Sequence, residues 1–170
     1  MARNEPSVLV RRTRHVDDVP VVGWREWLGL PTLGIKAKID TGARTSAIHA
    51  YNVQRFTERG APHVSFVVRP EQRRNDPAIS CSAEVRDERL VRSSSGHQEQ
   101  RYIVEIPASL GGHIWPIEVS LADRDPLGFR MLLGREAVRR RFLVDPDRSF
   151  LIGRCFADIS NVITRKGKPR

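Results

Sequence analysis

The chain has few of the features that several common protein classes depend on. It contains two Cys, Cys81 and Cys155, and no run of eighteen apolar residues. Two distant Cys do not make a disulfide framework, and without such an apolar run no membrane-spanning helix is expected. Arg11 and Arg12 are not followed by the apolar segment of an export signal. The sequence therefore predicts a cytoplasmic protein.

Nucleotide and zinc motifs are also missing. The phosphate loop G-x-x-x-x-G-K-[ST] does not occur, and Gly111 and Gly112 are not followed by Lys. There is no H-E-x-x-H, and tetrahedral zinc needs three or four close ligands. We therefore expect no metal site and no cofactor, and we interpret His49 as a structural residue. The His residues are scattered singly: His15, His49, His63, His97 and His113.

Length and composition indicate one domain. A chain of 170 residues with 39% hydrophobic content can bury a substantial core. We divide it into a basic N-terminal tail (residues 1–19), a central domain (residues 20–155) and a basic C-terminal tail (residues 156–170).

The net charge of +9 lies mostly at the two ends. Residues 1–15 carry a net +3 and residues 161–170 a net +4, so +2 remains for the body. A nearly balanced body has no obvious surface for tracking phosphates. The tails are either solvated or dock to the ribosome, a ribosomal protein, RNA or an acidic partner, and the sequence leaves both open.

The first informative motif is a carboxylate at a strand end. Ile35, Ala37 and Ile39 alternate with polar residues, the period of a half-buried strand, so Asp40 faces away from the apolar side. Thr41 can donate a hydroxyl hydrogen bond, and Gly42 permits a turn or a close approach. These residue types can hold a carboxylate at the floor of a cleft, although Asp-Thr-Gly also occurs as an ordinary turn.

Two separated segments together resemble a known family. The run Asp40 to Ala47 is similar to the active-site segment of retropepsin-like aspartic proteases, and Leu132 to Arg135 is similar to their second signature. Gly23 to Trp27, Ile39 to Ala50 and Arg92 to Gly96 resemble a bacterial family labelled ATP-dependent zinc protease and grouped with retropepsins. The resemblance covers about residues 20–155. It implies an all-β fold, a retropepsin-like acid protease barrel with one short C-terminal helix.

The resemblance also implies a mechanism. Aspartic proteases use two Asp that share one proton to activate water against a peptide carbonyl. The chain has a single such motif, so we expect a homodimer in which Asp40 of each copy meets across a twofold axis. An unlike Asp is a less favoured alternative, the candidates being Asp123, Asp125 and Asp145, each in a stretch that reads as a turn.

Site residues are carried over position by position. The catalytic set is Asp40, Thr41 and Gly42. The structural second signature is Leu133, Gly134 and Arg135. The expected substrate-binding set is Ala43, Arg44, Arg92, Ser94 and Gly96.

Arg44 departs from the pattern of the retroviral relatives, which have an acid there that pairs with the later Arg. Arg44 and Arg135 would repel if placed alike, so another acid, for example Glu136, is expected to compensate. Alternatively Arg44 faces the cleft, where a guanidinium binds a carboxylate through two parallel hydrogen bonds. That arrangement would favour acidic peptides.

Short strands separated by turn clusters are expected through the rest of the chain, with one helix at Arg135 to Arg141. We interpret Trp24 and Trp27 as core or interface residues. Glu71 to Gln100 is either a flap over an extended peptide or a surface insertion. The strand candidates are Val21 to Leu28, Ile35 to Asp40, His63 to Arg69, Arg101 to Pro107, His113 to Leu121, Arg130 to Leu133 and Phe142 to Val144.

Two functions follow. The favoured one is a homodimeric aspartic peptidase, and because the resembling bacterial family is linked with ligases that add glutamates to protein ends, its substrates would include glutamate-rich tails. The alternative is a non-catalytic binding module on the same fold that docks to the ribosome, RNA or an acidic partner.

Overall fold

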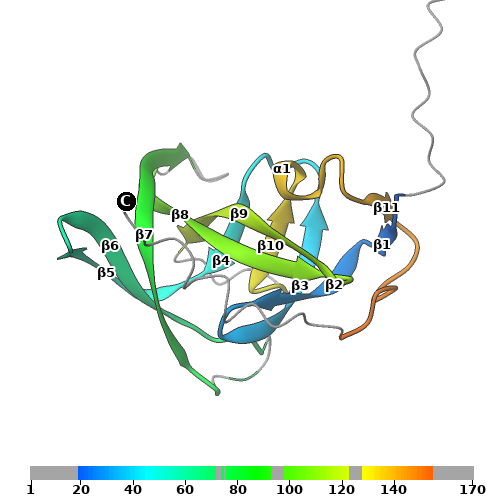
Figure 1. The fold of residues 1–170 in the computed structure, drawn as a ribbon, viewed down its shortest axis with the longest axis horizontal. Helices are drawn as coiled ribbons and strands as arrows, with labels where there is room; N and C mark the ends of the chain where they lie inside the picture. Colours follow the sequence, from blue (N-terminus) through cyan, green and yellow to red (C-terminus); the bar gives the residue numbers. More distant parts are fainter. Residues whose placement is uncertain (1–18, 72–73, 75, 93–97, 123–127, 155–170) are drawn as a thin grey trace, which may run out of the picture.

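The computed structural model describes residues 19–71, 74, 76–92, 98–122 and 128–154, which form strands and one short helix (Figure 1). The expected terminal tails fall outside these ranges almost entirely. No helix in the described ranges has the length and apolar content needed to cross a membrane. The elements are β1 (Val21–Gly23), β2 (Arg25–Leu30), β3 (Leu33–Asp40), β4 (Ser46–His49), β5 (Tyr51–Glu58), β6 (Ala61–Val68), β7 (Ile79–Arg92), β8 (Gln98–Leu110), β9 (His113–Ala122), β10 (Met131–Gly134), α1 (Arg135–Val138) and β11 (Leu143–Asp145).

A closed six-stranded barrel forms the body. The main sheet has the order β2-β3-β10-β4-β9-β8-β7-β6-β5, and an additional pairing of β2 with β8 at Gly29 and Ser109 closes the ring. This single residue pair closes the ring at the point where β2 meets β8. The predicted all-β barrel with one short helix is confirmed.

Alternating side chains fill the barrel. In β3, Ile35, Ala37 and Ile39 are buried, Lys38 is exposed and Asp40 is half-buried at the strand end. The pleat sends successive side chains to opposite faces, which is why the apolar alternation of the sequence becomes the core. The largest fully buried apolar side chains are Leu28, Ile35, Ile103, Leu110, Met131 and Leu133.

The position of β10 in the sheet brings the two signature segments, at Asp40 and at Gly134, together. β10 lies between β3, to which it is parallel, and β4, to which it is antiparallel. In this register Leu133 pairs with Ile39 and Gly134 with Asp40. Two segments far apart in the sequence therefore become neighbours at one end of the barrel (Figure 1).

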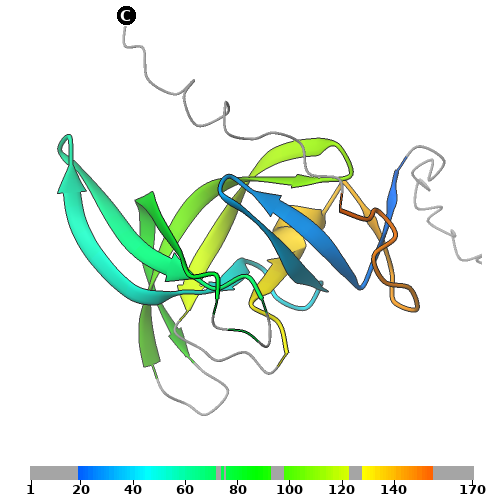
Figure 2. The ribbon, with the colours of Figure 1, turned by 90° about the horizontal axis from the view of Figure 1, so that it is seen from below.

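A β-extension projects from the barrel. β5 and β6 form a hairpin that pairs with β7, and it reaches away from the barrel body (Figure 2). Most of β5 is exposed, as expected for the edge strand of the sheet. The extension has one inward face, where Val64, Phe66 and Val68 join the core cluster.

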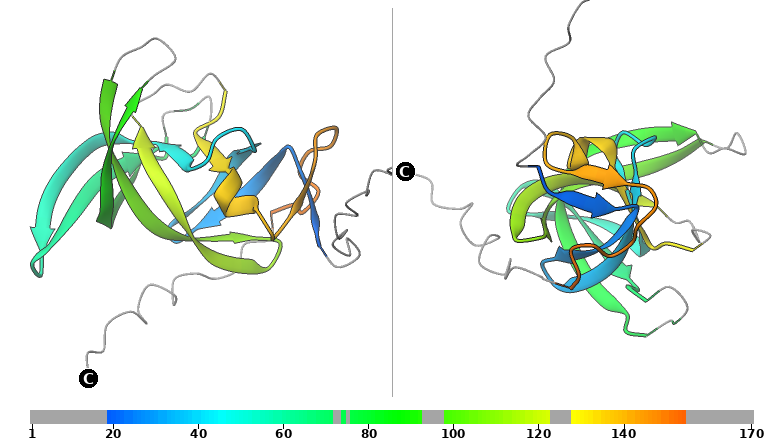
Figure 3. Two further views of the ribbon diagram at one scale, coloured as in Figure 1. Left: turned by 90° about the horizontal axis from the view of Figure 1, so that it is seen from above. Right: turned by 90° about the vertical axis from the view of Figure 1, so that its right-hand side faces the viewer.

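The C-terminal segment is held against the start of the domain. β1 and β11 form a separate two-stranded parallel sheet, seen in the right panel of Figure 3. After β11, the Leu151 amide and the Gly23 amide both donate to Oε1 of Glu26, at 2.8 and 2.7 Å. Glu26 is fully buried, so a carboxylate inside the molecule joins the end of β1 to the segment that follows β11.

Several element predictions need correction. The expected strand from Val21 to Leu28 is two strands interrupted at Trp24, whose amide donates to the Arg148 carbonyl at 3.0 Å instead of to a sheet neighbour. The helix ends at Val138 and does not reach Arg141. Three strands, β4, β5 and β7, were not predicted. β5 and β7 are rich in polar residues, which hide the apolar alternation on which strand prediction depends, and β4 is buried but has only four residues, too few to show a period.

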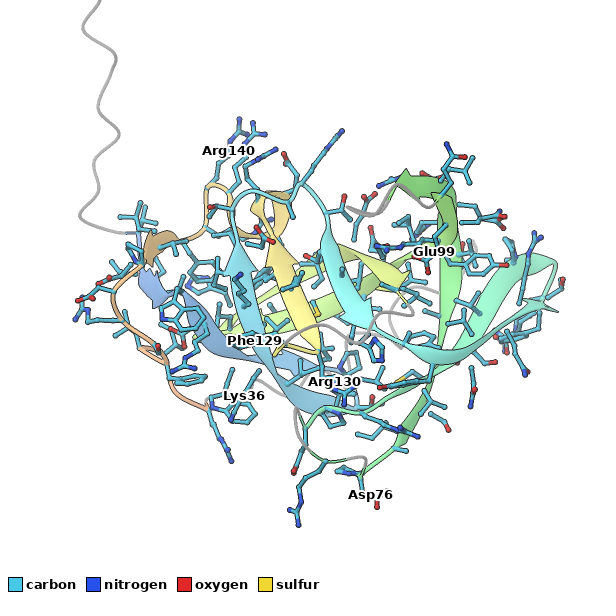
Figure 4. All side chains as sticks on the ribbon, turned by 180° about the vertical axis from the view of Figure 1, so that it is seen from behind. Lys36, Asp76, Glu99, Phe129, Arg130 and Arg140 are labelled. Carbon is cyan, nitrogen blue, oxygen red and sulfur yellow. The ribbon has the colours of Figure 1, made fainter. Side chains whose placement is uncertain are left out.

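Trp24, which lies between β1 and β2, and Trp27 of β2 are both half-buried, so neither is a core residue, and a role at an interface stays a prediction. The Arg25 guanidinium lies 4.5 Å from the Trp24 ring centre, and the Arg154 guanidinium lies 3.9 Å from that of Trp27. Both rings therefore contact cations. Figure 4 shows Lys36, which also approaches Trp27 at 5.2 Å, on this side of the molecule.

Candidate active site

Asp40 is fixed by the turn that follows it. The Gly42 and Ala43 amides donate to its Oδ1 at 3.1 and 3.2 Å. These two bonds close a turn around the carboxylate and fix its orientation. The side chain is half-buried at the end of β3, and the exposed Thr41 and Gly42 follow it. The sequence prediction of a carboxylate held at a strand end agrees with this geometry.

The second signature is bound directly to this turn. The Arg135 amide donates to the Ala43 carbonyl at 2.8 Å, and the Glu136 amide donates to the Arg44 carbonyl at 3.2 Å. The Arg135 guanidinium donates to the Thr41 carbonyl at 3.0 Å. Backbone and side chain of α1 therefore hold the Asp-Thr-Gly turn from one side.

Glycine is required at position 134 because the backbone of Thr45 passes very close to it. A Cβ at this position would lie 2.5 Å from the Thr45 carbonyl carbon, closer than side chains approach backbone. The buried Gly134 amide donates to Ser46 Oγ at 3.0 Å, which joins β10 to β4. Ser46 was not predicted as a site residue, because a single Ser at a strand start carries no signal without its partner.

Arg44 does not face the repulsion that its position suggested. Arg44 is exposed, and the Arg135 guanidinium is bound to a carbonyl. The Glu136 carboxylate accepts from Arg139 at 3.2 and 3.5 Å, so the expected compensation by Glu136 is wrong. Backbone dipoles, and not an acid, satisfy Arg135.

The other predicted substrate-binding residues have different outcomes. Ala43 is half-buried and its amide binds Asp40. Arg92 ends β7, where it pairs in register with Gln98 of β8. Ser94 and Gly96 lie outside the described residues. The stretch considered as a flap thus contains β7 and the start of β8, two strands of one hairpin, with its tip outside the description.

The unlike-Asp alternative gains no support from the described residues. The Asp145 carboxylate is bound by the Arg148 guanidinium at 2.7 Å and by the Asp147 amide at 2.9 Å. Asp123 and Asp125 lie outside the described ranges. Asp40 makes no ion pair within the described part of the chain.

Within residues 19–154, apart from the undescribed gaps, no three His, Cys, Asp or Glu gather as a metal site would require. His49 is buried, with its ring centre 4.1 Å from that of Tyr51. This placement suits the structural role that the sequence suggested.

Known proteins match this arrangement closely. Residues 21–155 match the RimB-like family, described as retropepsin-like aspartic endopeptidase RimB. The chain belongs to this family. The description names an aspartic endopeptidase and no metal, so the zinc protease label that the sequence resembled is not confirmed.

Curated relatives of the family carry a different name. A protein of Shewanella halifaxensis named "Probable alpha-L-glutamate ligase" is 45% identical over 140 residues, which are 81% of this chain and 31% of that protein. A protein of the same name from Desulfotalea psychrophila is 42% identical over 136 residues, 78% of this chain and 29% of that protein. The chain thus spans roughly a third of the length of the curated relatives it matches.

A solved structure has the same fold. The Legionella pneumophila protein Lpg0085, described as of unknown function, matches with a TM-score of 0.66 and 26% identity. The match covers 78% of this chain and 98% of that chain. The barrel of the RimB-like family therefore occurs in a solved protein of nearly the same extent as this domain.

Proposed function

We propose that the chain is an aspartic peptidase that acts as a homodimer, with Asp40 of each copy forming one catalytic pair. The observation that carries the proposal is the geometry of Asp40. The Asp-Thr-Gly turn binds one of its carboxylate oxygens, and α1 binds that turn. Family membership supports the same chemistry.

A second carboxylate completes the mechanism. Two Asp that share one proton can act together, one taking a proton from water and the other giving one to the peptide carbonyl oxygen. The chain has one Asp-Thr-Gly, and a twofold axis supplies the second from an identical surface. The two amides bind Oδ1, and in this proposal Oδ2 is the oxygen that meets water and substrate.

The proposed substrates are peptides with acidic, glutamate-rich ends. The relatives named glutamate ligases associate this domain with glutamate chemistry. Arg44 is exposed four residues after Asp40 and makes no ion pair with the described residues. An unpaired guanidinium so near the scissile bond is suited to a carboxylate.

The peptide would bind in an extended conformation. β7 and β8 form a hairpin, and they are the two longest strands of the fold. In this proposal its main chain pairs with the substrate, and the hairpin excludes water during reaction.

Replacement of Asp40 by Asn tests the proposal. Asn keeps the size of the side chain and cannot share the proton, so hydrolysis of a glutamate-rich peptide should fall by at least about 100-fold. Asp147→Asn, an exposed Asp after β11, is the matched control and should cleave normally. Sedimentation should show dimers for both variants.

Three results would count against the peptidase. A wild-type protein that sediments only as a monomer, even with excess peptide, would remove the second carboxylate. Equal cleavage by the Asp40→Asn variant would place the chemistry elsewhere. A protein that cleaves no peptide but still binds an acidic partner would favour the non-catalytic module.

A further inference from the structure

Two adjoining hollows follow α1 on the surface beside the Asp-Thr-Gly turn. The first has a volume of about 410 Å³ and the second about 470 Å³, and both are lined by Glu136 and Arg139. We call them together the α1 groove. Its lining residues are Arg44, Thr45, Ser46, Pro116, Ile117, Glu118, Glu136, Ala137, Arg139, Arg140 and Arg141.

The α1 groove has an excess of positive charge. Its two acids already have cationic partners, since Glu136 accepts from Arg139 at 3.2 Å and Glu118 accepts from Arg89 at 3.4 Å. Arg44, Arg140 and Arg141 have no acidic partner among the described residues. Three guanidinium groups are therefore available in one groove.

The available cations lie at both ends of the groove. Arg44 lines the hollow next to the Asp-Thr-Gly turn, and Arg140 and Arg141 line the hollow beyond α1. Arg140 projects away from the ribbon at this edge of the molecule (Figure 4). The guanidinium of Arg141 lies 5.7 Å from the ring centre of Trp115, and this cation–π contact holds its side chain at the groove.

The groove is positioned rigidly with respect to Asp40. Asp40 accepts from the Ala43 amide, and the Ala43 carbonyl accepts from the Arg135 amide at 2.8 Å. The next carbonyl, that of Arg44, accepts from the Glu136 amide at 3.2 Å. Two successive backbone bonds thus fix the groove wall to the catalytic turn.

We infer that the α1 groove binds the carboxylates of an acidic peptide segment along a path that begins at Arg44, beside the catalytic turn, and continues to Arg140 and Arg141, away from the bond that is cleaved. The inference rests on the proposed peptidase function and assigns the place where its acidic substrate docks. Guanidinium groups bind carboxylates through paired hydrogen bonds, and Thr45 and Ile117 give the groove the mixed polar and apolar lining that suits a peptide.

A peptide fits this groove better than a nucleic acid. Glu118 and Glu136 also line the groove, and a nucleic acid, with a phosphate at every step, cannot avoid placing charge beside them. The side chains of a flexible peptide can instead turn their carboxylates toward Arg44 and Arg140 and away from the two Glu. The docking segment would then be a flexible one with several acids.

The test separates binding from catalysis. A fluorescent peptide carrying a run of Glu, and its counterpart carrying Gln, are titrated into full-length Asp40→Asn protein and followed by anisotropy. In that background Arg140→Gln with Arg141→Gln removes two groove charges. The matched control, Arg55→Gln with Arg59→Gln, removes two exposed charges from the β5–β6 hairpin.

We expect the groove variant to bind the Glu peptide about five to tenfold more weakly and the control to bind it normally. The Gln peptide should bind weakly to all three proteins, and added salt should remove the difference between the two peptides. In proteins with Asp40 intact, the groove variant should raise KM for the Glu peptide with little change in kcat.

Some results would overturn the inference. Equal weakening by groove and control variants would show a response to net charge alone. Single-stranded RNA that competes fully with the Glu peptide, and loses affinity in the groove variant, would assign the groove to nucleic acid. If the Glu peptide binds through the groove but wild-type protein does not cleave it, the proposed peptidase is contradicted and the binding role of the groove is supported. If wild-type protein cleaves the peptide and the groove variant cleaves it equally well, the peptidase is supported and the binding role of the groove is contradicted.

Discussion

Glu26 is the residue whose replacement should damage the fold most. Its carboxylate is fully buried and accepts three backbone amides, from Gly23 at 2.7 Å, Leu151 at 2.8 Å and Ile152 at 3.3 Å. Glu26→Ala removes the acceptor and leaves all three donors without a partner. Leaving a buried amide unpaired destabilises the fold by more than a hydrogen bond normally stabilises it, because water cannot replace the lost acceptor.

The expected loss follows from the burial of each amide. The Gly23 bond is buried, so its loss should cost about 2 kcal/mol, whereas the other two amides are partly buried and can regain water at about 0.5–1 kcal/mol each. The free energy of unfolding should thus fall by about 3–4 kcal/mol, a large share of the usual stability of a domain. Glu26→Gln retains one oxygen for Gly23 and Leu151, so its loss should be about half as large.

Denaturation in urea measures these losses, and hydrogen exchange locates them. Exchange should speed up at the Gly23, Leu151 and Ile152 amides in Glu26→Ala. The control is Glu58→Ala, an exposed acid of the β5–β6 hairpin, which should change stability by less than about 0.5 kcal/mol. A Glu26→Ala protein within about 1 kcal/mol of wild type, with the Gly23 amide still protected, would refute the reasoning.

Three further outcomes are expected. Gly134→Ala places a Cβ 2.5 Å from the Thr45 carbonyl carbon, and it should lower stability by about 1–3 kcal/mol in thermal unfolding and impair cleavage. The Arg148 hydrogen bond lowers the pKa of Asp145, so its stabilisation is present above the unfolded pKa of about 3.9 and is lost as the pH falls through the folded value. NMR titration should show the low midpoint and its return toward normal in Arg148→Ala. Burial raises the pKa of the Cys81 thiol, so alkylation followed by peptide mapping should be slower at pH 8 in folded than in unfolded protein.

Controls distinguish these effects from general damage. Gly134 has a φ of −74°, which Ala adopts without strain, so the cost of its replacement comes from the close approach alone. Gly60→Ala, where no neighbour lies within 4 Å and φ is 81°, measures the backbone cost without a clash. A Gly134→Ala protein as stable as wild type would show that close approach does not require Gly134. An Asp145 midpoint at the ordinary aspartate value, or equal alkylation rates for folded and unfolded Cys81, would contradict the other two predictions.

The sequence by itself indicated the fold class, through its resemblance to a family, and the position of Asp40 at the end of a strand. Ile35, Ala37 and Ile39 alternate with polar residues, and this pattern of near neighbours predicts a half-buried strand without any knowledge of tertiary contacts. For the same reason Asp40 could be placed at a strand end. The second signature at Gly134 was found by resemblance, since no local rule links it to Asp40.

Only the tertiary structure decided how these pieces support one another. The parallel pairing of β10 with β3, the turn of backbone bonds from Asp40 to Arg135, and the arginine-lined groove all join residues far apart in the sequence. Glu26 shows why such features escape a sequence. An acid in a strand is expected to face water, and it is buried here because the C-terminal segment brings two amides to it. Long-range contacts assign partners to polar groups, and a pattern of neighbours does not contain that information.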